Sequence, residues 1–159
     1  MPTEHEHTVV EETAACSAKQ RNLDEAAAFD ELFRSLMRRG FGARAECLVS
    51  LRFADDFEEG DEPLSLESVR GFVKLMDIFQ DLGEPMLGRF SAGTLSVEWR
   101  IADDKLLLVE PLGGDAASFA LIGPSLTADA DGFRLNGRGK IAEVIHALRK
   151  HGIDKWRDA

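Results

Sequence analysis

The clearest pattern of hydrophobic and polar positions in the chain is a strict alternation over residues 94–101. Successive side chains of a β-strand point to opposite faces of a sheet, so a period of two directs one set of residues toward a core. That inward set is Leu95, Val97, Trp99 and Ile101. The pattern predicts a strand with one buried face, and it places Trp99 in the core.

Two more strands are predicted directly after this one. Residues 105–110 contain four consecutive apolar side chains, Leu106 to Val109, which is typical of a strand covered on both faces and indicates the middle of a sheet. Pro111 cannot donate a backbone hydrogen bond and is expected to end this strand. The third strand is expected at 118–122, and together the three form a β-meander. Turns rich in Asp and Gly are expected at 102–104 and 113–115.

The segment 64–82 carries the strongest helical pattern. Its apolar residues recur every three or four positions, which is typical of a helix with one buried face. Ser65 is a favourable N-terminal cap, and Gly83 is the expected stop. Three strands with one apolar face need a covering element, so we expect this helix to be the main cover of the sheet. The apolar stripe consists of Leu66, Val69, Phe72, Val73, Leu75, Met76, Phe79 and Leu82.

Two further helices flank this central part in our prediction. The first begins with Asn22 as its cap and ends at Gly40, and the second runs from Arg138 to His151. Between residues 43 and 53 the apolar positions fit one face of a strand and one face of a helix equally well. Both alternatives stay open for that segment.

The predicted fold class is α+β, with a three- to four-stranded antiparallel β-meander packed against two or three helices. The fourth strand is expected at 132–135, before a turn at Asn136-Gly137. Residues 21–159 are long enough for a single α+β domain. Residues 1–20 are polar and acidic, and we expect them to form a disordered or weakly ordered tail.

Charge narrows the classes of function. The chain has 19 Lys and Arg against 29 Asp and Glu, and its formal net charge is −10. This balance argues against a general nucleic-acid binder, which presents a basic surface. We find no apolar run of membrane-spanning length and no signal-peptide pattern. Cys16 and Cys47 are two lone thiols, typical of a reducing compartment. We therefore expect a cytoplasmic protein that binds neither nucleic acid nor a membrane.

Candidate metal ligands occur in several places. His5 and His7 flank Glu6, but two ligands fall short of the three or four of a zinc site. The acidic segment 55–62 offers oxygen ligands, although its spacing differs from that of a calcium-binding EF-hand. Solvated loop and turn positions account for these residues as well, so we expect no metal site and no cofactor. A nuclease-like set of carboxylates and a lysine on the predicted hairpin comprises Glu98, Asp103, Asp104, Lys105 and Glu110.

The segment 134–157 is basic within this acidic chain. It pairs with the acidic loop, or is solvated, or offers a cationic surface to a partner, and these alternatives stay open. Residues 136–140 are expected either to hold an anion at a helix N-terminus or to form a plain turn. No nucleotide-binding loop and no Gly-x-Ser-x-Gly motif is present. Cys47 is expected to be a buried packing residue. His146 and His151 have no neighbour in the sequence that suggests acid–base chemistry, so no catalytic residue is predicted.

An acidic loop, an apolar helix, Gly-Glu-Pro-Met and a Gly-x-x-x-x-Glu-Trp hairpin follow one another in this chain. This order resembles a group of uncharacterised small bacterial proteins found near mobile elements and toxin–antitoxin pairs. The matching residues are Phe57-Glu58-Glu59, where the group usually has Trp-Asp-Gly, and Gly93 with Glu98-Trp99. The resemblance covers residues 43–122 and carries no established activity. It favours a helix at 43–53 and an accessory or immunity-type role.

Two classes of function are compatible with these observations. We expect a non-enzymatic binding or accessory module, immunity- or antitoxin-like, that acts through a protein partner or through self-association. An exposed sheet edge or an uncovered apolar surface would make the contact. The alternative is a metal-dependent hydrolase that uses hairpin carboxylates, Glu98 and Glu110 among them.

Overall fold

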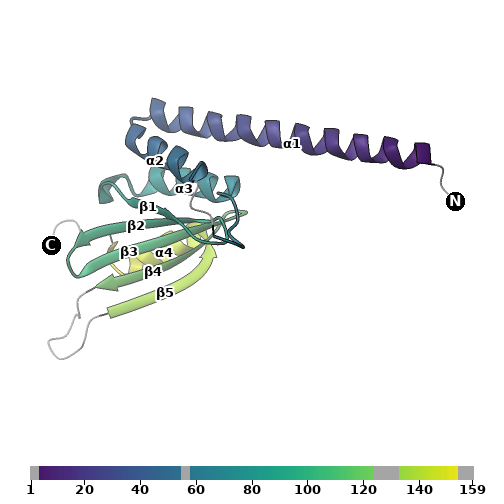
Figure 1. Cartoon of the computed structure of the whole chain (residues 1–159). Helices are drawn as coiled ribbons and strands as arrows, with labels where there is room; N and C mark the ends of the chain where they lie inside the picture. The colour runs from purple at the N-terminus through teal and green to yellow at the C-terminus, as the bar shows by residue number, and fades with distance from the viewer. Residues whose placement is uncertain (1–3, 55–57, 124–132, 154–159) are drawn as a thin grey trace.

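The computed structural model describes residues 4–54, 58–123 and 133–153, and its elements are shown in Figure 1. Helices and strands follow one another in two blocks, with most helices before the sheet and one after it. In chain order they are α1 (Glu4–Arg38), α2 (Gly42–Arg52), α3 (Leu66–Ile78), the short 3₁₀ helix η1 (Gln80–Leu82), β1 (Met86–Arg89), β2 (Leu95–Ala102), β3 (Lys105–Gly113), β4 (Ala116–Gly123), β5 (Phe133–Lys140) and α4 (Ile141–Lys150). This arrangement confirms the predicted α+β class.

The strands form one antiparallel sheet in the order β1-β2-β3-β4-β5, so each strand pairs with its neighbours in the sequence. The meander is confirmed, and β3 lies in its middle as predicted. Among the described residues the sheet has five strands, whereas we expected three or four. The prediction missed β1 because its four residues include Gly88 and show no clear alternation.

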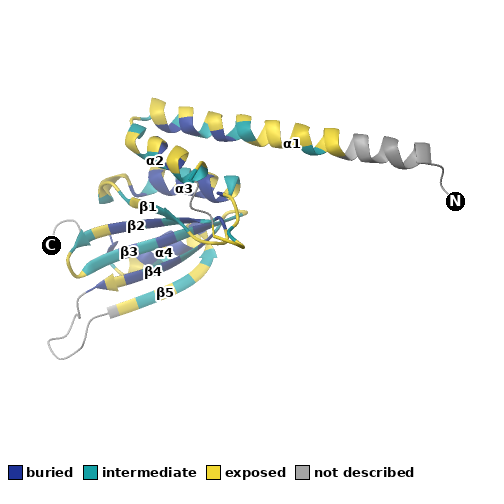
Figure 2. Ribbon diagram, viewed as in Figure 1, coloured by how far each residue is buried: buried dark blue, intermediate teal, exposed yellow. Residues whose placement is uncertain are grey.

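One face of the sheet is buried. Trp99 of β2 lies opposite Leu107 of β3, and Leu107 lies opposite Leu121 of β4, so alternate residues line the same face. Trp99 is only 1% exposed, which confirms its predicted place in the core. Figure 2 shows this burial as dark blue segments along the strands. The buried set includes Leu95, Val97, Trp99, Leu107, Val109, Ala117, Phe119 and Leu121.

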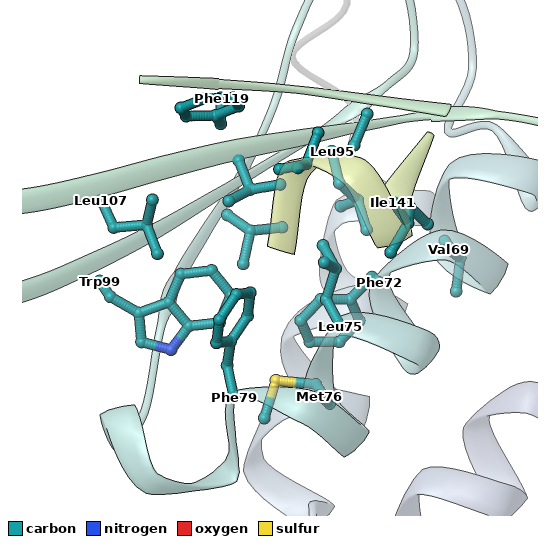
Figure 3. Packing of buried hydrophobic residues seen from close by; sticks show 14 of the residues in the cluster. Val69, Phe72, Leu75, Met76, Phe79, Leu95, Trp99, Leu107, Phe119 and Ile141 are labelled. Carbon is teal, nitrogen blue, oxygen red and sulfur yellow. The ribbon is translucent and has the colours of Figure 1, made fainter. Parts of the chain in front are cut away.

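Helices α3 and α4 cover this buried face. In Figure 3, Phe72 and Leu75 from α3 lie close to Ile141 from α4 beneath the strands. Phe79, just after α3, meets the indole of Trp99 edge-on, with the ring centroids 5.6 Å apart. The predicted helix over 64–82 is thus a cover of the sheet, although its last turn is η1. Ser65 is its cap as expected and accepts a hydrogen bond from the Ser68 backbone N–H at 3.3 Å.

Helix α1 is longer than predicted. It begins at Glu4 rather than at Asn22, and Figure 1 shows its first half extending away from the other elements. It therefore includes most of the segment 1–20 that we expected to be a disordered or weakly ordered tail. Runs of Ala and Glu on both sides of Asn22 have high helix propensity and outweigh the capping signal. The packed part of the helix contributes Phe29, Phe33 and Leu36 to the core. No helix in the described ranges is long and apolar enough to cross a membrane.

The segment 43–53, for which strand and helix stayed open, is helical in α2. Its buried residues are Ala45 and Leu48. Cys47 is half-buried rather than buried, and burial raises the pKa of its thiol. A raised pKa favours the protonated and unreactive form, so Cys47 remains a packing residue.

Strand β3 continues through Pro111, where we expected it to end. Pro111 lies opposite Ala117, and the register between β3 and β4 shifts between Pro111 and Gly113. A proline is tolerated at such an irregularity because its missing N–H is not needed there. Its carbonyl oxygen accepts a hydrogen bond from the buried Ser68 hydroxyl at 2.5 Å.

Strand β5 also corrects a prediction, because it runs through the expected turn at Asn136-Gly137. Helix α4 accordingly begins at Ile141 instead of Arg138. The reason lies on the neighbouring strand, where Phe119 is directly opposite Gly137. A Cβ atom at Gly137 would lie 2.9 Å from Cε1 of the Phe119 ring. The glycine makes room for an aromatic ring in this sheet and does not mark a hairpin turn.

Helix α3 packs closely against β3 at Gly71, where a Cβ atom would lie 2.8 Å from the Cβ of Pro111. We expect Gly71→Ala to lower the free energy of unfolding by about 1–3 kcal/mol through overpacking, although alanine is the better helix former. Urea denaturation measures this change. Gly42→Ala is the matched control, because a Cβ there meets only the Met37 sulfur at 3.5 Å. A Gly71→Ala protein as stable as the Gly42→Ala protein would contradict this close approach.

Candidate functional site

The second face of the sheet, which we call the outer face, points away from α3 and α4. Three rows of side chains cross it, because residues paired between neighbouring strands lie side by side. Ile122 is 38% exposed, and Leu106 and Leu108 are half-buried. The run from Leu106 to Val109 is therefore covered fully on only one face, which corrects our expectation of cover on both. The rows are Arg100, Leu106, Ile122 and Arg134; Glu98, Leu108, Ala120 and Asn136; and Glu110, Ser118 and Arg138.

A hollow of about 420 Å³ lies on the outer face over β3, β4 and β5. Apolar groups of Leu108 and Ala120 line it, and Phe90 lines it from the connection between β1 and β2. Arg134 and Arg138 of β5 complete it on the polar side. A hollow of this size accommodates a small molecule or one large side chain, since binding pockets span about 300–1,000 Å³.

The charge of this site comes from two arginines. Arg134 and Arg138 are both exposed, and neither forms an ion pair with another described residue. Arg100 on the same face differs, because its guanidinium lies 3.4 Å from the Glu98 carboxylate. A guanidinium group carries five N–H donors in a planar fork that matches a carboxylate, so these arginines are suited to bind an acidic group. An overall acidic chain thus presents a positive β5 side on its outer face.

Glu110, the one carboxylate among the described residues that line the hollow, has partners on both oxygens. The Thr94 hydroxyl donates to Oε1 at 2.5 Å, and the Ser118 hydroxyl donates to Oε2 at 3.1 Å. These hydrogen bonds join β3 to the residue before β2 and to β4. They hold the carboxylate in one orientation. A carboxylate engaged in this way is better suited to a structural role in the lining of the hollow than to proton transfer.

The nuclease-like set does not converge. Glu98 and Glu110 share the outer face, but Glu98 is opposite Leu108 and is paired with Arg100. Asp103 and Asp104 lie exposed in the turn between β2 and β3. Lys105 follows this turn at the start of β3. Within the described part of the chain, no three His, Cys, Asp or Glu residues lie close enough together to hold a metal ion.

The other residues that we considered as metal ligands, charged contacts or catalytic groups do not lie together in the part of the chain that the structure describes. The side chains of His5 and His7, and residues 55–57 of the acidic segment, lie outside the described residues. Asp61 of that segment pairs with Arg89 of β1 at 3.5 Å, whereas Arg134 and Arg138 are on β5 at the opposite edge of the sheet. His146 is exposed on α4, and His151 follows that helix. Neither belongs to the outer face.

Of residues 136–140, which we considered for anion binding at a helix N-terminus, only Lys140 lies at that terminus, as the N-cap of α4. The whole segment belongs to β5, and the N-terminus of α4 is capped from within the chain. The Glu143 carboxylate accepts a hydrogen bond from the Lys140 backbone N–H at 2.9 Å. This carboxylate occupies the position that a bound anion would need. The side chains of Asn136 and Arg138 line the hollow, because both lie on the outer face of β5.

The residues that carry the bacterial-protein resemblance are mostly structural. Gly93 has a φ of +77°, and a Cβ atom there would collide with the Pro63 carbonyl oxygen, so only glycine fits this turn. Trp99 is buried in the core. Glu98 and Met86, the last residue of Gly-Glu-Pro-Met, lie on the outer face, because they are opposite each other on β2 and β1. The motif therefore indicates how the first hairpin is built rather than a reaction.

A second hollow of about 310 Å³ lies between α1, the end of α2 and the segment before α3. Its arginine, Arg52, is already stacked over the Phe29 ring at 4.2 Å. The cations of the outer-face hollow have no such contact within the described residues. The outer face is accordingly the stronger candidate site.

We did not predict Phe90 as a site residue. Arg134 and Arg138 entered our predictions only within the basic segment 134–157, and Arg138 also within the possible anion site at 136–140, and not as one pair on a strand face. The signal for the arginines was present, because Arg134, Asn136 and Arg138 alternate with Leu135, Gly137 and Gly139. The glycines and the Asn-Gly pair led us to a turn instead of a strand with one polar face. Phe90 has no local signal, because it approaches the hollow from another part of the chain.

Comparisons of this chain with known protein families, with characterised proteins and with solved structures found no match. Its function is therefore inferred from the geometry of the outer face. That face combines an apolar floor over Leu108 and Ala120, the Glu110 carboxylate held by two hydroxyls, and two arginines without an ion pair among the described residues.

Proposed function

We propose that this protein is a non-enzymatic binding module that takes a protein partner on the outer face of its sheet. The observation that carries the proposal is the apolar centre of that face beside two arginines, Arg134 and Arg138, that form no ion pair with any described residue. Arginine and apolar side chains are enriched in the buried centres of protein interfaces, where charged residues other than arginine are depleted. The immunity- or antitoxin-like role and the cytoplasmic location stay predictions.

Exposed apolar side chains support a macromolecular partner. Ile122 and Phe90 are each 38% exposed, and Met86 on the β1 edge is 61% exposed. Met86 lies opposite Glu98, so it belongs to the same face as the hollow. Exposed apolar groups that gather on one face mark interaction surfaces more often than isolated ones do. A partner that covers this face removes them from water.

The chemistry of the hollow favours binding over catalysis. Its carboxylate, Glu110, is engaged by two hydroxyls, and neither His146 nor His151 lies on this face. The serine in the hollow, Ser118, donates to that carboxylate and has no histidine as a base among the described residues. The metal-dependent hydrolase that the sequence left as an alternative receives no supporting geometry from the described residues.

A photocrosslinking amino acid at Asn136 tests the proposal. Asn136 is exposed and lines the hollow. In the native host, irradiation is expected to join the protein to one discrete partner through this position. The partner is then identified by mass spectrometry, and a second copy of this chain is recognised by its mass.

The matched control is the same photocrosslinker at His146, which is exposed on α4 away from the outer face. It is expected to give no discrete adduct of that mass. Equal adducts from both positions would indicate unspecific contact. The absence of any adduct from Asn136 would refute the proposed docking face.

A further inference from the structure

We infer that the partner contributes an acidic, extended segment that pairs with β5 as a sixth strand. This inference rests on the proposed docking function and specifies the chemistry of the partner. The segment carries one carboxylate at position i and a second at position i+4, with an apolar residue at i+2. Its pattern is thus acidic-x-apolar-x-acidic. Three features of β5 lead to this occupant.

The first feature is the free edge of β5. This strand of eight residues is hydrogen-bonded to β4 and to no other described strand. As far as the described residues extend, its backbone N–H and C=O groups on the far side have no strand partner and can pair with an added strand. The other edge strand, β1, has only four residues and offers a shorter ladder.

The second feature is the spacing of the cations. Arg134 and Arg138 lie on the same face of β5, four residues apart. A strand rises about 3.3 Å per residue, so the two backbone positions are about 13 Å apart. An extended partner has the same rise, and carboxylates at positions i and i+4 meet both arginines in register. The residue at i+2 then lies beside Asn136, at the β5 rim of the hollow, and its side chain can reach from there toward Ala120. That hollow suits an apolar or aromatic side chain.

The third feature is selectivity against a second copy of the same edge. Antiparallel pairing of two β5 strands would place the basic side chains of one copy beside those of the other. Like charges in facing positions destabilise a sheet, and charged edges are a known protection against self-pairing. An acidic strand would place carboxylates beside the same arginines, and opposite charges in facing positions stabilise the pairing. Charge complementarity thus selects an acidic partner over a homodimer of this edge.

A synthetic peptide that contains Glu-Thr-Phe-Thr-Glu tests the inference with purified full-length protein. Calorimetry measures its affinity, and hydrogen exchange followed by NMR measures the protection of individual β5 amides. We expect binding that slows exchange at those β5 amides that do not bond to β4. A peptide with Lys in place of both Glu, and a peptide with methylated backbone nitrogens on its pairing edge, are expected not to bind.

The protein variant for this test carries Arg134→Glu and Arg138→Glu. It is expected to bind the peptide about tenfold more weakly or worse, because opposed charges become like charges. Lys150→Glu, an exposed charge reversal on α4, is the control and is expected to bind as before. Far-UV circular dichroism checks that each variant is folded.

The outcomes separate this inference from the docking function. If the Asn136 adduct forms but the peptide does not bind at millimolar concentration, the added strand is refuted and the docking face stands. If the N-methylated peptide binds as well as the unmodified one, the partner lies on the face without strand pairing, and the inference is equally refuted. Loss of the adduct itself removes the function on which the inference rests.

Discussion

Trp99→Ala is expected to lower the free energy of unfolding by about 3–5 kcal/mol, the cost of truncating a large buried aromatic side chain. Trp99 is among the largest side chains of the core and is 1% exposed. It joins Phe79 to Leu107 of β3, as Figure 3 shows, so its loss leaves a cavity between a helix end and the middle of the sheet. Urea denaturation, followed by far-UV circular dichroism, measures the effect without a tryptophan signal.

Trp99→Phe is the matched control for this prediction. The indole Nε1 is buried without a hydrogen-bond partner among the described residues. Phenylalanine removes that unpaired donor and keeps most of the apolar volume, so we expect a cost below about 1.5 kcal/mol. If the alanine variant lost no more stability than the phenylalanine variant, Trp99 would not have the central packing role that the structure gives it.

Ser68→Ala is expected to cost about 2–4 kcal/mol, because each buried polar group left without a partner costs about 1–3 kcal/mol. The Ser68 hydroxyl is fully buried and connects three elements. It donates to the Pro111 carbonyl of β3 at 2.5 Å and accepts from the Leu95 N–H of β2 at 2.9 Å. Alanine removes the hydroxyl partner of both backbone groups beneath α3. Equilibrium unfolding in urea measures the change.

The control for Ser68 is Ser50→Ala. Ser50 also lies in a helix, and its hydroxyl also donates to a backbone carbonyl, that of Glu46 at 3.1 Å. Ser50 is exposed, however, so water replaces the lost hydrogen bond and we expect a change within about 0.5 kcal/mol. Similar effects of the two substitutions would show that the buried hydroxyl does not tie α3 to the sheet.

Local pattern was sufficient for the parts of the fold that have one buried face and clear boundaries. The alternation from Leu95 to Ile101 predicted β2, its buried Trp99 and its place in a meander. The apolar stripe and the Ser65 cap predicted α3. In these segments the periodicity, the capping residues and the turn residues all indicate the same element. Such agreement allows the element to be predicted from sequence alone.

Prediction failed where one segment depends on another that is distant in sequence. Gly137 looks like a turn residue until Phe119 is placed opposite it on β4. Pro111 looks like the end of a strand until the shifted register and the Ser68 hydroxyl are known. These contacts are tertiary, and a single sequence does not reveal them.

The candidate site was harder to predict than the fold for the same reason. The basic segment 134–157 was visible as charge, but its face and neighbours depend on the register between β4 and β5. The hydrogen bonds from Thr94 and Ser118 to Glu110 join three parts of the meander. Without the register, Glu110 looked like a member of a metal-binding set. Once the register is known, Glu110 is found to line the outer-face hollow, with both carboxylate oxygens hydrogen-bonded.

The most direct test of the docking face is the yield of the Asn136 photocrosslink when Arg134 and Arg138 are both replaced by glutamate. Because Asn136 lies between them on the same side of β5, the photocrosslinker reports contact at the site itself. We predict that the yield of the partner adduct falls about tenfold or more in this variant. An undiminished adduct from a folded double variant would contradict a docking face that recognises its partner through these two arginines.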